Sequence, residues 1–190
     1  MGQKTNIDEQ QRIQLILAGK HDEYAYFVRQ YSQALLDFTS RMVGDVSDAE
    51  ELAQDTFVKA YRSLSSFAGT SSFYTWLRRI AYHESLNYLR RRKFHWVNID
   101  EVVMESDVSD EDLSTGKEER ILLMEESIDN LAPEERMLIH LYYFEDIPLR
   151  EIAFIMNVES NVLATRLHRI RKKLLLMIKQ RERDERTKRQ

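Results

Sequence analysis

Aromatic and basic side chains alternate in the stretch "SSFYTWLRRIAYHESLNYLRRRK", residues 71–93. Aromatic rings stack on unpaired bases and Arg or Lys side chains bind phosphates, so this combination suits single-stranded nucleic acid. The competing interpretation is an ordinary amphipathic helix with a solvated basic end. We favour that interpretation for Phe73 and Trp76, which we expect in the core. A binding function would then depend on the preceding Ser-rich loop, on His83 and Asn87, and on the arginines at 90–92.

A second basic surface is predicted near the end of the chain. Leu163, Leu167, Ile170 and Leu174 follow helical spacing, and Arg166, Arg169 and Lys173 lie on another side of the same helix. A short helix at 149–156 and the turn "NVES" precede it, which gives the dimensions of a helix-turn-helix. A solvated face on a terminal helix is the simpler alternative. The turn and the fixed apolar stripe favour a recognition helix that reads duplex DNA.

The charges are distributed unevenly around a net charge of −4. Segments 78–93 and 166–190 are strongly basic, whereas the segment 100–119 between them is strongly acidic. Such asymmetry is typical of nucleic-acid-binding proteins. The five histidines show no metal-ligand spacing, and no phosphate loop or nucleophile motif occurs, so we expect neither a cofactor nor an enzyme. The absence of cysteine, signal sequence and membrane span fits a cytoplasmic protein.

Helical periodicity and only five Gly and two Pro predict an all-α fold. We expect helices at about 7–18, 24–43, 48–64 and 72–92. The third should be capped by Ser47 with Glu50 in a capping box. The apolar stripe of the second is Tyr24, Phe27, Val28, Tyr31, Leu35, Phe38 and Met42.

Periodicity is lost at about 94–116, which predicts an acidic, flexible linker. Beyond it we expect a helix with the stripe Ile121, Met124, Ile128 and Leu131, and a second helix that starts at Pro133. The predicted domains are therefore 1–93, a linker at 94–117, 118–180, and a charged tail at 181–190.

Two blocks of this sequence resemble a known family. "DAEELAQDTFVKAYRSLSSF" followed by "SSFYTWLRRIAYHESLNYLRRRK" is similar to region 2 of the extracytoplasmic-function group of sigma-70 family sigma factors. "LAPEERMLIHLYYFEDIPLREIAFIMNVESNVLATRLHRIRKKL" is similar to region 4 of the same group. The resemblance covers roughly residues 10–178. It implies a region 2 helical bundle and a region 4 helix-turn-helix.

The resemblance also implies roles for particular residues. Region 2 would bind the clamp helices of the largest subunit of RNA polymerase through Asp48, Glu51, Gln54, Asp55 and Lys59. It would recognise and help to melt the promoter −10 element through Ala68, Gly69, Thr70, Ser71, Ser72, Tyr74, Arg79, His83, Asn87, Arg90 and Arg91. Region 4 would read the −35 element through Ser160, Asn161, Ala164, Thr165, Arg166, His168, Arg169, Arg171 and Lys172.

The start of the predicted recognition helix departs from the family pattern. The family usually has G-T-V-K/R-T/S-R there, whereas this chain has "NVLATR". Val162 stands in place of the usual Thr and Ala164 in place of a basic residue, so Ser160 is the candidate capping residue. Ser72 stands where many family members have Lys or Arg.

The expected function is therefore promoter-specific initiation of transcription together with core RNA polymerase, including its flap region. The expected partners are polymerase, promoter DNA and an anti-sigma factor that could hold the protein at the inner membrane; no small-molecule substrate is expected. One alternative is a polymerase-independent helix-turn-helix regulator with an effector-binding helical domain. Another is a helical scaffold whose charges are incidental.

Overall fold

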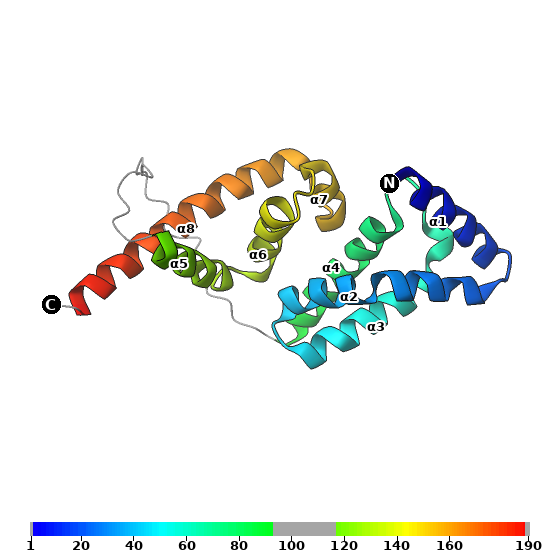
Figure 1. The fold of residues 1–190 in the computed structure, drawn as a ribbon, viewed down its shortest axis with the longest axis horizontal. Coiled ribbons are helices and arrows are strands. Elements are labelled where there is room, and N and C mark those ends of the chain that lie inside the picture. The colour runs from blue at the N-terminus through cyan, green and yellow to red at the C-terminus, as the bar shows by residue number, and fades with distance from the viewer. Residues whose placement is uncertain (1, 93–116, 189–190) are drawn as a thin grey trace. The chain divides into compact units, whose positions relative to one another are not determined.

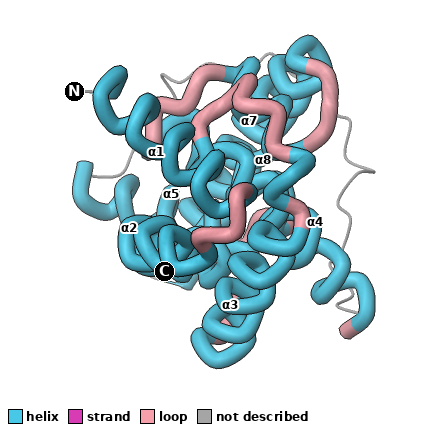
Figure 2. The backbone as a smooth tube through the Cα atoms, turned by 90° about the vertical axis from the view of Figure 1, so that its right-hand side faces the viewer, coloured by secondary structure: helices cyan, strands magenta, loops and turns pink. Residues whose placement is uncertain are grey.

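The protein is built from helices joined by short loops. The computed structural model describes residues 2–92 and 117–188, and within these two ranges it contains helices and no strand (Figure 2). This confirms the predicted all-α fold. The predicted linker, and the domain boundaries on either side of it, fall on or beside residues outside the described ranges, so these boundaries stay predictions.

Three long helices form the body of the N-terminal region, α2 (Tyr24–Val43), α3 (Val46–Arg62) and α4 (Phe73–Arg91). Each of them packs against the other two. The first helix, α1 (Gly2–Leu17), is joined to α2 by the short turn η1 (His21–Glu23), and a second turn, η2 (Leu64–Ser66), follows α3 (Figure 1). Backbone contacts also group residues Arg150–Val158 with this unit, and these include most of the short helix α7 (Leu149–Met156).

The core of this bundle is aromatic and aliphatic. Phe27, Leu35 and Leu77 are fully buried, and the rings of Phe27 and Phe73 lie 4.2 Å apart. Two hydrogen bonds add specificity between helices: Thr39 Oγ1 donates to the carbonyl of Ala49, and the Tyr24 hydroxyl donates to the carbonyl of Phe57. Because buried polar groups need partners, these bonds fix the register of α2 against α3.

The turn between α2 and α3 corrects one sequence prediction. Gly44 ends α2 with a φ of +78°, a conformation that favours glycine. The next helix then begins at Val46, and the Asp45 carboxylate accepts the backbone N–H of Asp48. The predicted cap at Ser47 with Glu50 is therefore wrong. Asp45 is equally suited to capping, and it comes first after the glycine.

The C-terminal region contains α5 (Lys117–Asp129), α6 (Pro133–Ile139), the π-helical turn η4 (His140–Phe144), α7 (Leu149–Met156) and α8 (Ser160–Lys188). Pro133 is the first residue of α6, as predicted. Helix α8 packs against α5 and α6. It continues as a helix to Lys188, through most of the segment that the sequence suggested to be a tail.

The predicted apolar stripe of α5 is wrong in its first half. Ile121 is 50% exposed and Met124 is 46% exposed, whereas Leu123 and Ser127 are buried. Of the other two predicted residues, Ile128 is half-buried and Leu131 is buried. Ser127 satisfies its hydroxyl by donating to the carbonyl of Leu123, which permits its burial. The packing of α5 against α8 determines which of its apolar side chains are buried.

Candidate nucleic-acid interface

The loop before α4 presents small side chains between two packed aromatic residues. Ala68, Gly69, Thr70 and Ser72 are exposed, and Ser71 is half-buried. Phe67 precedes the loop and Phe73 follows it; the ring of Phe67 lies 5.2 Å from that of Trp76, which lies 5.8 Å from that of Phe73. Small exposed side chains leave room for a flat group such as a nucleobase.

Ser72 joins this loop to α4. Its hydroxyl oxygen accepts the backbone N–H of Thr75 at 3.0 Å, which caps the helix, and it lies 2.7 Å from the Thr75 hydroxyl. Gly69 adopts a φ of +68°. The loop therefore has a defined exit into the helix and a turn that glycine makes without strain.

The predicted polar side of α4 is present. Asn87, Arg90 and Arg91 are exposed, and Tyr74, Arg79 and His83 are half-buried. Phe73, Leu77 and Ala81 occupy the opposite, buried side, which confirms the expectation that Phe73 belongs to the core. Trp76 is half-buried at the edge of that core, and Ile80, also expected on the packed side, is half-buried as well.

The surroundings of His83 favour the neutral form of its ring. Partial burial lowers its pKa, and the nearby cations Arg79 and Arg90 lower it further. A neutral imidazole can both donate and accept a hydrogen bond, as can the Asn87 amide one helical turn further on. This part of α4 can therefore donate hydrogen bonds to a DNA base and accept them from it, and the cations Arg90 and Arg91 lie further along the helix.

A separate hollow of about 360 Å³ lies between α3 and the end of α4. It is lined by Asp48, Glu51, Leu52, Asp55, Tyr88, Arg91 and Arg92. The Arg92 guanidinium donates to Asp48 at 2.5 Å and lies over the Tyr88 ring at 5.1 Å. The hollow thus has an acidic side from α3 and a basic side from α4.

The five predicted polymerase-binding residues differ in how available they are. Glu51, Gln54 and Asp55 are exposed. Asp48 is half-buried and paired with Arg92, and Lys59 is paired with Glu84 on α4. Sequence reasoning missed Arg92 in this surface and grouped Arg91 with the −10 residues alone. Only the packing of α3 against α4 brings both arginines beside the acidic row.

Helix α8 has the two predicted sides. Leu163, Leu167, Ile170 and Leu174 are buried, whereas Ser160, Asn161, Ala164, Thr165, His168, Arg169, Arg171 and Lys172 are exposed and Arg166 is half-buried. Lys173 donates to Glu135 at 2.7 Å, which ties α8 to α6. The exposed row thus faces outward from a helix that is anchored on its other side.

The turn before α8 shows how the unusual "NVLATR" start is accommodated. Asn157 ends α7 with a φ of +56°, and the N–H of Val158 donates to the carbonyl of Ala153. At the start of α8, the Asn161 side-chain oxygen accepts the N–H of Val162 at 2.7 Å. Asn161 therefore supplies the side-chain acceptor there, rather than the predicted Ser160.

Other kinds of site are missing from the part of the chain that the structure describes. Residues 2–92 and 117–188 hold no group of three or more His, Asp or Glu side chains that could bind a metal ion. No helix in those ranges is long and apolar enough to cross a membrane.

Comparison with known families matches both regions. Residues 27–95 match Sigma-70 region 2, and residues 121–174 match Sigma-70, region 4. The first match contains the loop and α4, and the second contains α7 and the basic row of α8.

Similar proteins cover almost the whole chain. The ECF RNA polymerase sigma-E factor of Escherichia coli is 32% identical over 177 residues, which span 87% of this chain and 91% of that protein. The RNA polymerase sigma-H factor of Pseudomonas aeruginosa is 30% identical over 179 residues, 88% of this chain and 92% of that protein. ECF RNA polymerase sigma factor SigW of Bacillus subtilis is 29% identical over 180 residues, which span 86% of this chain and 92% of that protein.

Solved structures share the fold. CnrH in complex with the cytosolic domain of CnrY gives a TM-score of 0.61 at 19% identity and covers 92% of this chain and 96% of that one. RpoE in complex with the anti-sigma factor NepR from Bartonella quintana gives a TM-score of 0.58 at 22% identity, and it covers 83% of this chain and 97% of that one.

The N-terminal region is a helical bundle with a basic, aromatic helix, and a helix-turn-helix segment follows it. This combination is typical of helical DNA-binding proteins that act in transcription. The two matches and the relatives show more: the chain belongs to the extracytoplasmic-function (ECF) group of the sigma-70 family. It is therefore a sigma factor that directs transcription by RNA polymerase from promoters. Sigma factors are initiation factors without catalytic activity of their own, and the polymerase-independent regulator is not favoured.

Proposed function

We propose that this sigma factor recognises the −10 element, as unpaired DNA, with the loop 68–72 and the polar side of α4. The observation that carries the proposal is the capped loop between Gly69 and Ser72, which lies directly before that side. A base that leaves the stack needs a shallow, preformed site, and its backbone needs nearby cations. The exposed Arg90 and Arg91 supply the cations.

The −35 element would be read as duplex DNA by the exposed row of α8. Thr165 and Arg166 lie one turn into the helix, where side chains of a recognition helix reach base edges. Arg169, Arg171 and Lys172 lie further along and suit phosphate contacts. Ala164 brings no charge, so contact with the DNA at this position would be apolar, as with a thymine methyl group.

Core polymerase would bind the surface formed by α3 beside the hollow. Glu51 and Asp55 are exposed acids on one side of α3, and a basic partner helix would complement them. Arg91 and Arg92 on the opposite side of the hollow would fix the orientation of that partner. Charge reversal at Glu51 should weaken assembly with core polymerase more than charge reversal at Glu50, which is also exposed but does not line the hollow.

An anti-sigma factor would control the free protein. Two structures that share the fold are complexes, of CnrH with the cytosolic domain of CnrY and of RpoE with NepR. These complexes support a partner of the same kind here. Because polymerase acts in the cytoplasm, the complex with the anti-sigma factor would also lie there. An anti-sigma factor that is anchored in the inner membrane would hold the protein at that membrane.

Transcription with purified components tests the −10 assignment. Core polymerase with the wild-type chain is given a promoter library in which the −10 segment is randomised, and transcripts are sequenced. We expect His83→Ala and Asn87→Ala to change the preferred bases. Gln14→Ala, at an exposed position of α1, is the matched control and should leave them unchanged. An unchanged preference in both α4 variants would refute the assignment.

A further inference from the structure

The first helix lies before the segment that matches Sigma-70 region 2, which begins at residue 27. We propose that α1 is a positioning element of the −10 surface: Glu9 holds Tyr31 and, through it, Tyr74, while Gln10 borders the loop at Gly69. The inference rests on the −10 surface proposed above. It assigns a role in promoter selection to residues outside the −10 surface proposed above.

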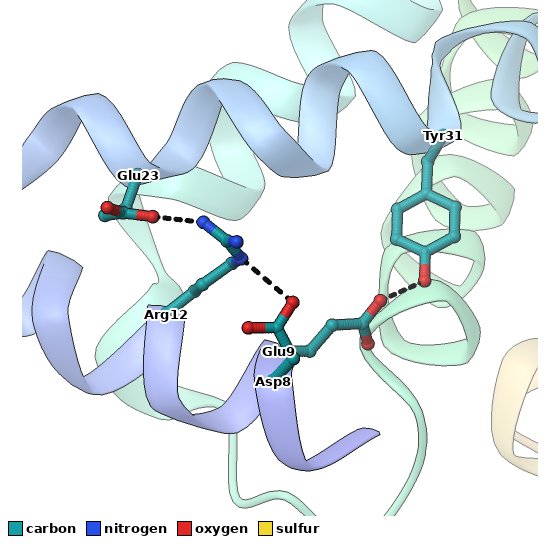
Figure 3. A network of polar contacts seen from close by, with 5 residues as sticks. All are labelled: Asp8, Glu9, Arg12, Glu23 and Tyr31. Atoms are coloured by element: carbon teal, nitrogen blue, oxygen red, sulfur yellow. Dashed lines mark hydrogen bonds and ion pairs between the residues drawn. The ribbon is translucent and has the colours of Figure 1, made fainter. Parts of the chain in front are cut away.

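The first contact joins α1 to α2. The Tyr31 hydroxyl donates a hydrogen bond to Oε1 of Glu9 (Figure 3). The Glu9 residue is only 3% exposed, so its carboxyl group is removed from water and depends on this partner. A hydrogen bond to a buried carboxyl is strong and directional, and it restricts the Tyr31 side chain to one position.

The second contact passes from Tyr31 to the proposed DNA surface. The rings of Tyr31 and Tyr74 stack with centroids 4.9 Å apart and an angle of 6° between their planes. The Arg78 guanidinium carbon lies 4.1 Å from the centre of the Tyr74 ring. Tyr74 is thereby placed by two neighbours, of which Tyr31 is itself fixed by Glu9.

The third contact is with the loop. A Cβ atom placed on Gly69 would lie 3.6 Å from Nε2 of Gln10, so the exposed side chain of Gln10 borders the loop at its turn. Helix α1 also packs against η2, which precedes the loop. Consecutive residues of α1 thus support the two parts of the −10 surface, Tyr74 and the loop.

A different attachment of α1 provides the control. Arg12 pairs with Asp8 at 3.2 Å and with Glu23 in η1 (Figure 3). Its guanidinium carbon also lies 4.3 Å from the centre of the Tyr26 ring. These contacts hold the same helix but include neither Glu9 nor Tyr74. Loss of the Arg12–Glu23 pair should therefore leave the Glu9–Tyr31 hydrogen bond and the Tyr31–Tyr74 stack in place.

Positioning matters because a base that leaves the duplex must find its site already formed. A loop and a ring that have to be ordered on binding reduce the affinity for the correct base. If the loop and the ring become ordered only when the correct base binds, the difference in affinity between correct and incorrect bases also becomes smaller. A purely structural role would instead reduce transcription from all promoters in equal proportion.

The experiment uses holoenzyme assembled from core polymerase and the full chain, with the randomised −10 library. Glu9→Ala and Tyr31→Phe remove the bond from either side, and Tyr31→Phe keeps the ring that stacks on Tyr74. We expect both to reduce base discrimination at the −10 segment about three- to tenfold, the usual effect of one lost hydrogen bond. Glu9→Gln keeps an acceptor oxygen and should retain discrimination, as should Glu23→Gln at the control pair.

The outcomes separate this inference from the −10 assignment. If Asn87→Ala changes the preferred bases but Tyr31→Phe leaves discrimination at the wild-type value, α1 does not position the surface and the inference is wrong. It is equally wrong if Tyr31→Phe lowers transcription from all promoters in proportion. If neither Asn87→Ala nor His83→Ala alters base preference, the −10 surface itself is wrongly assigned. Thermal unfolding of each variant identifies any loss of fold.

Discussion

The Ser72 hydroxyl oxygen accepts the backbone N–H of Thr75 at 3.0 Å, so the loop proposed to hold a −10 base ends in the cap of α4. One side chain therefore serves both helix stability and the shape of the loop. Ser72 is also exposed, so DNA bound at the proposed loop could reach it.

Substitutions at Ser72 should separate these two roles. Ser72→Ala removes the cap and should lower the free energy of unfolding by about 1 kcal/mol. Ser72→Asp keeps an acceptor for the Thr75 N–H and should retain stability, but its negative charge should repel the DNA phosphates. The measurements are urea unfolding and initiation from a cognate promoter. Equal initiation by the Asp variant and wild type would contradict a DNA contact at the loop.

The general architecture could be predicted because helical periodicity and turn residues agree along the chain. Gly44, Pro133 and the turn before α8 lie at helix ends as expected. The errors concern choices that depend on neighbours. Val28 belongs to the predicted stripe of α2 but is 36% exposed. On α5, packing against α8 buries Leu123 and leaves the predicted Ile121 and Met124 exposed.

Trp76 should matter for stability and not for base choice. Its half-buried ring packs against those of Phe67 and Phe73. Replacement by Ala removes most of that contact, and we expect a loss of about 3 kcal/mol in the free energy of unfolding. Trp76→Phe keeps an aromatic ring and should lose clearly less. Among molecules that remain folded, the −10 base preference should equal that of wild type, which the transcript library measures directly.

Arg169 offers a test of the α8 surface. It is exposed in the same row as Thr165, and a phosphate contact there contributes to affinity mainly through counterion release. For Arg169→Ala we expect holoenzyme to bind −35 promoter DNA more weakly, with the slope of log affinity against log salt reduced by about one. Arg183→Ala changes an exposed arginine further along the same helix and serves as the control. Identical salt slopes for the two variants would argue against the assigned role of Arg169.

The candidate site was only partly visible in the sequence. The exposed positions of α4 and α8 follow from helical spacing and from the resemblance to the family. The contribution of α1 does not, because Glu9 and Tyr31 are 22 positions apart and meet only when α1 packs on α2. Arg92 was missed for a similar reason: its partner Asp48 lies 44 positions earlier, on a different helix. Neighbouring residues in the sequence do not show which distant side chain will pair with a given polar residue, so such pairs cannot be predicted from local patterns.

The buried carboxyl of Glu9 should make stability depend on pH. Burial raises its pKa, and the hydrogen bond from Tyr31 offsets only part of this effect. A raised pKa in the folded state means that the folded protein binds the proton more tightly than the unfolded chain does. The associated stabilisation is complete below the unfolded pKa of about 4.3, and it is lost as the pH rises through the folded value.

Glu9→Gln removes this titration but keeps an oxygen that accepts the Tyr31 hydroxyl. We therefore expect the variant to gain stability relative to wild type as the pH rises from 4 to 7, because wild type must then hold a buried charge. Urea unfolding of both proteins across that range measures the difference. Asp37→Asn, which makes the same kind of change at an exposed carboxyl of α2, is the control. If the Gln variant instead loses stability relative to wild type with rising pH, the ionised carboxylate is the form that the Tyr31 bond stabilises, and Glu9 holds Tyr31 through charge.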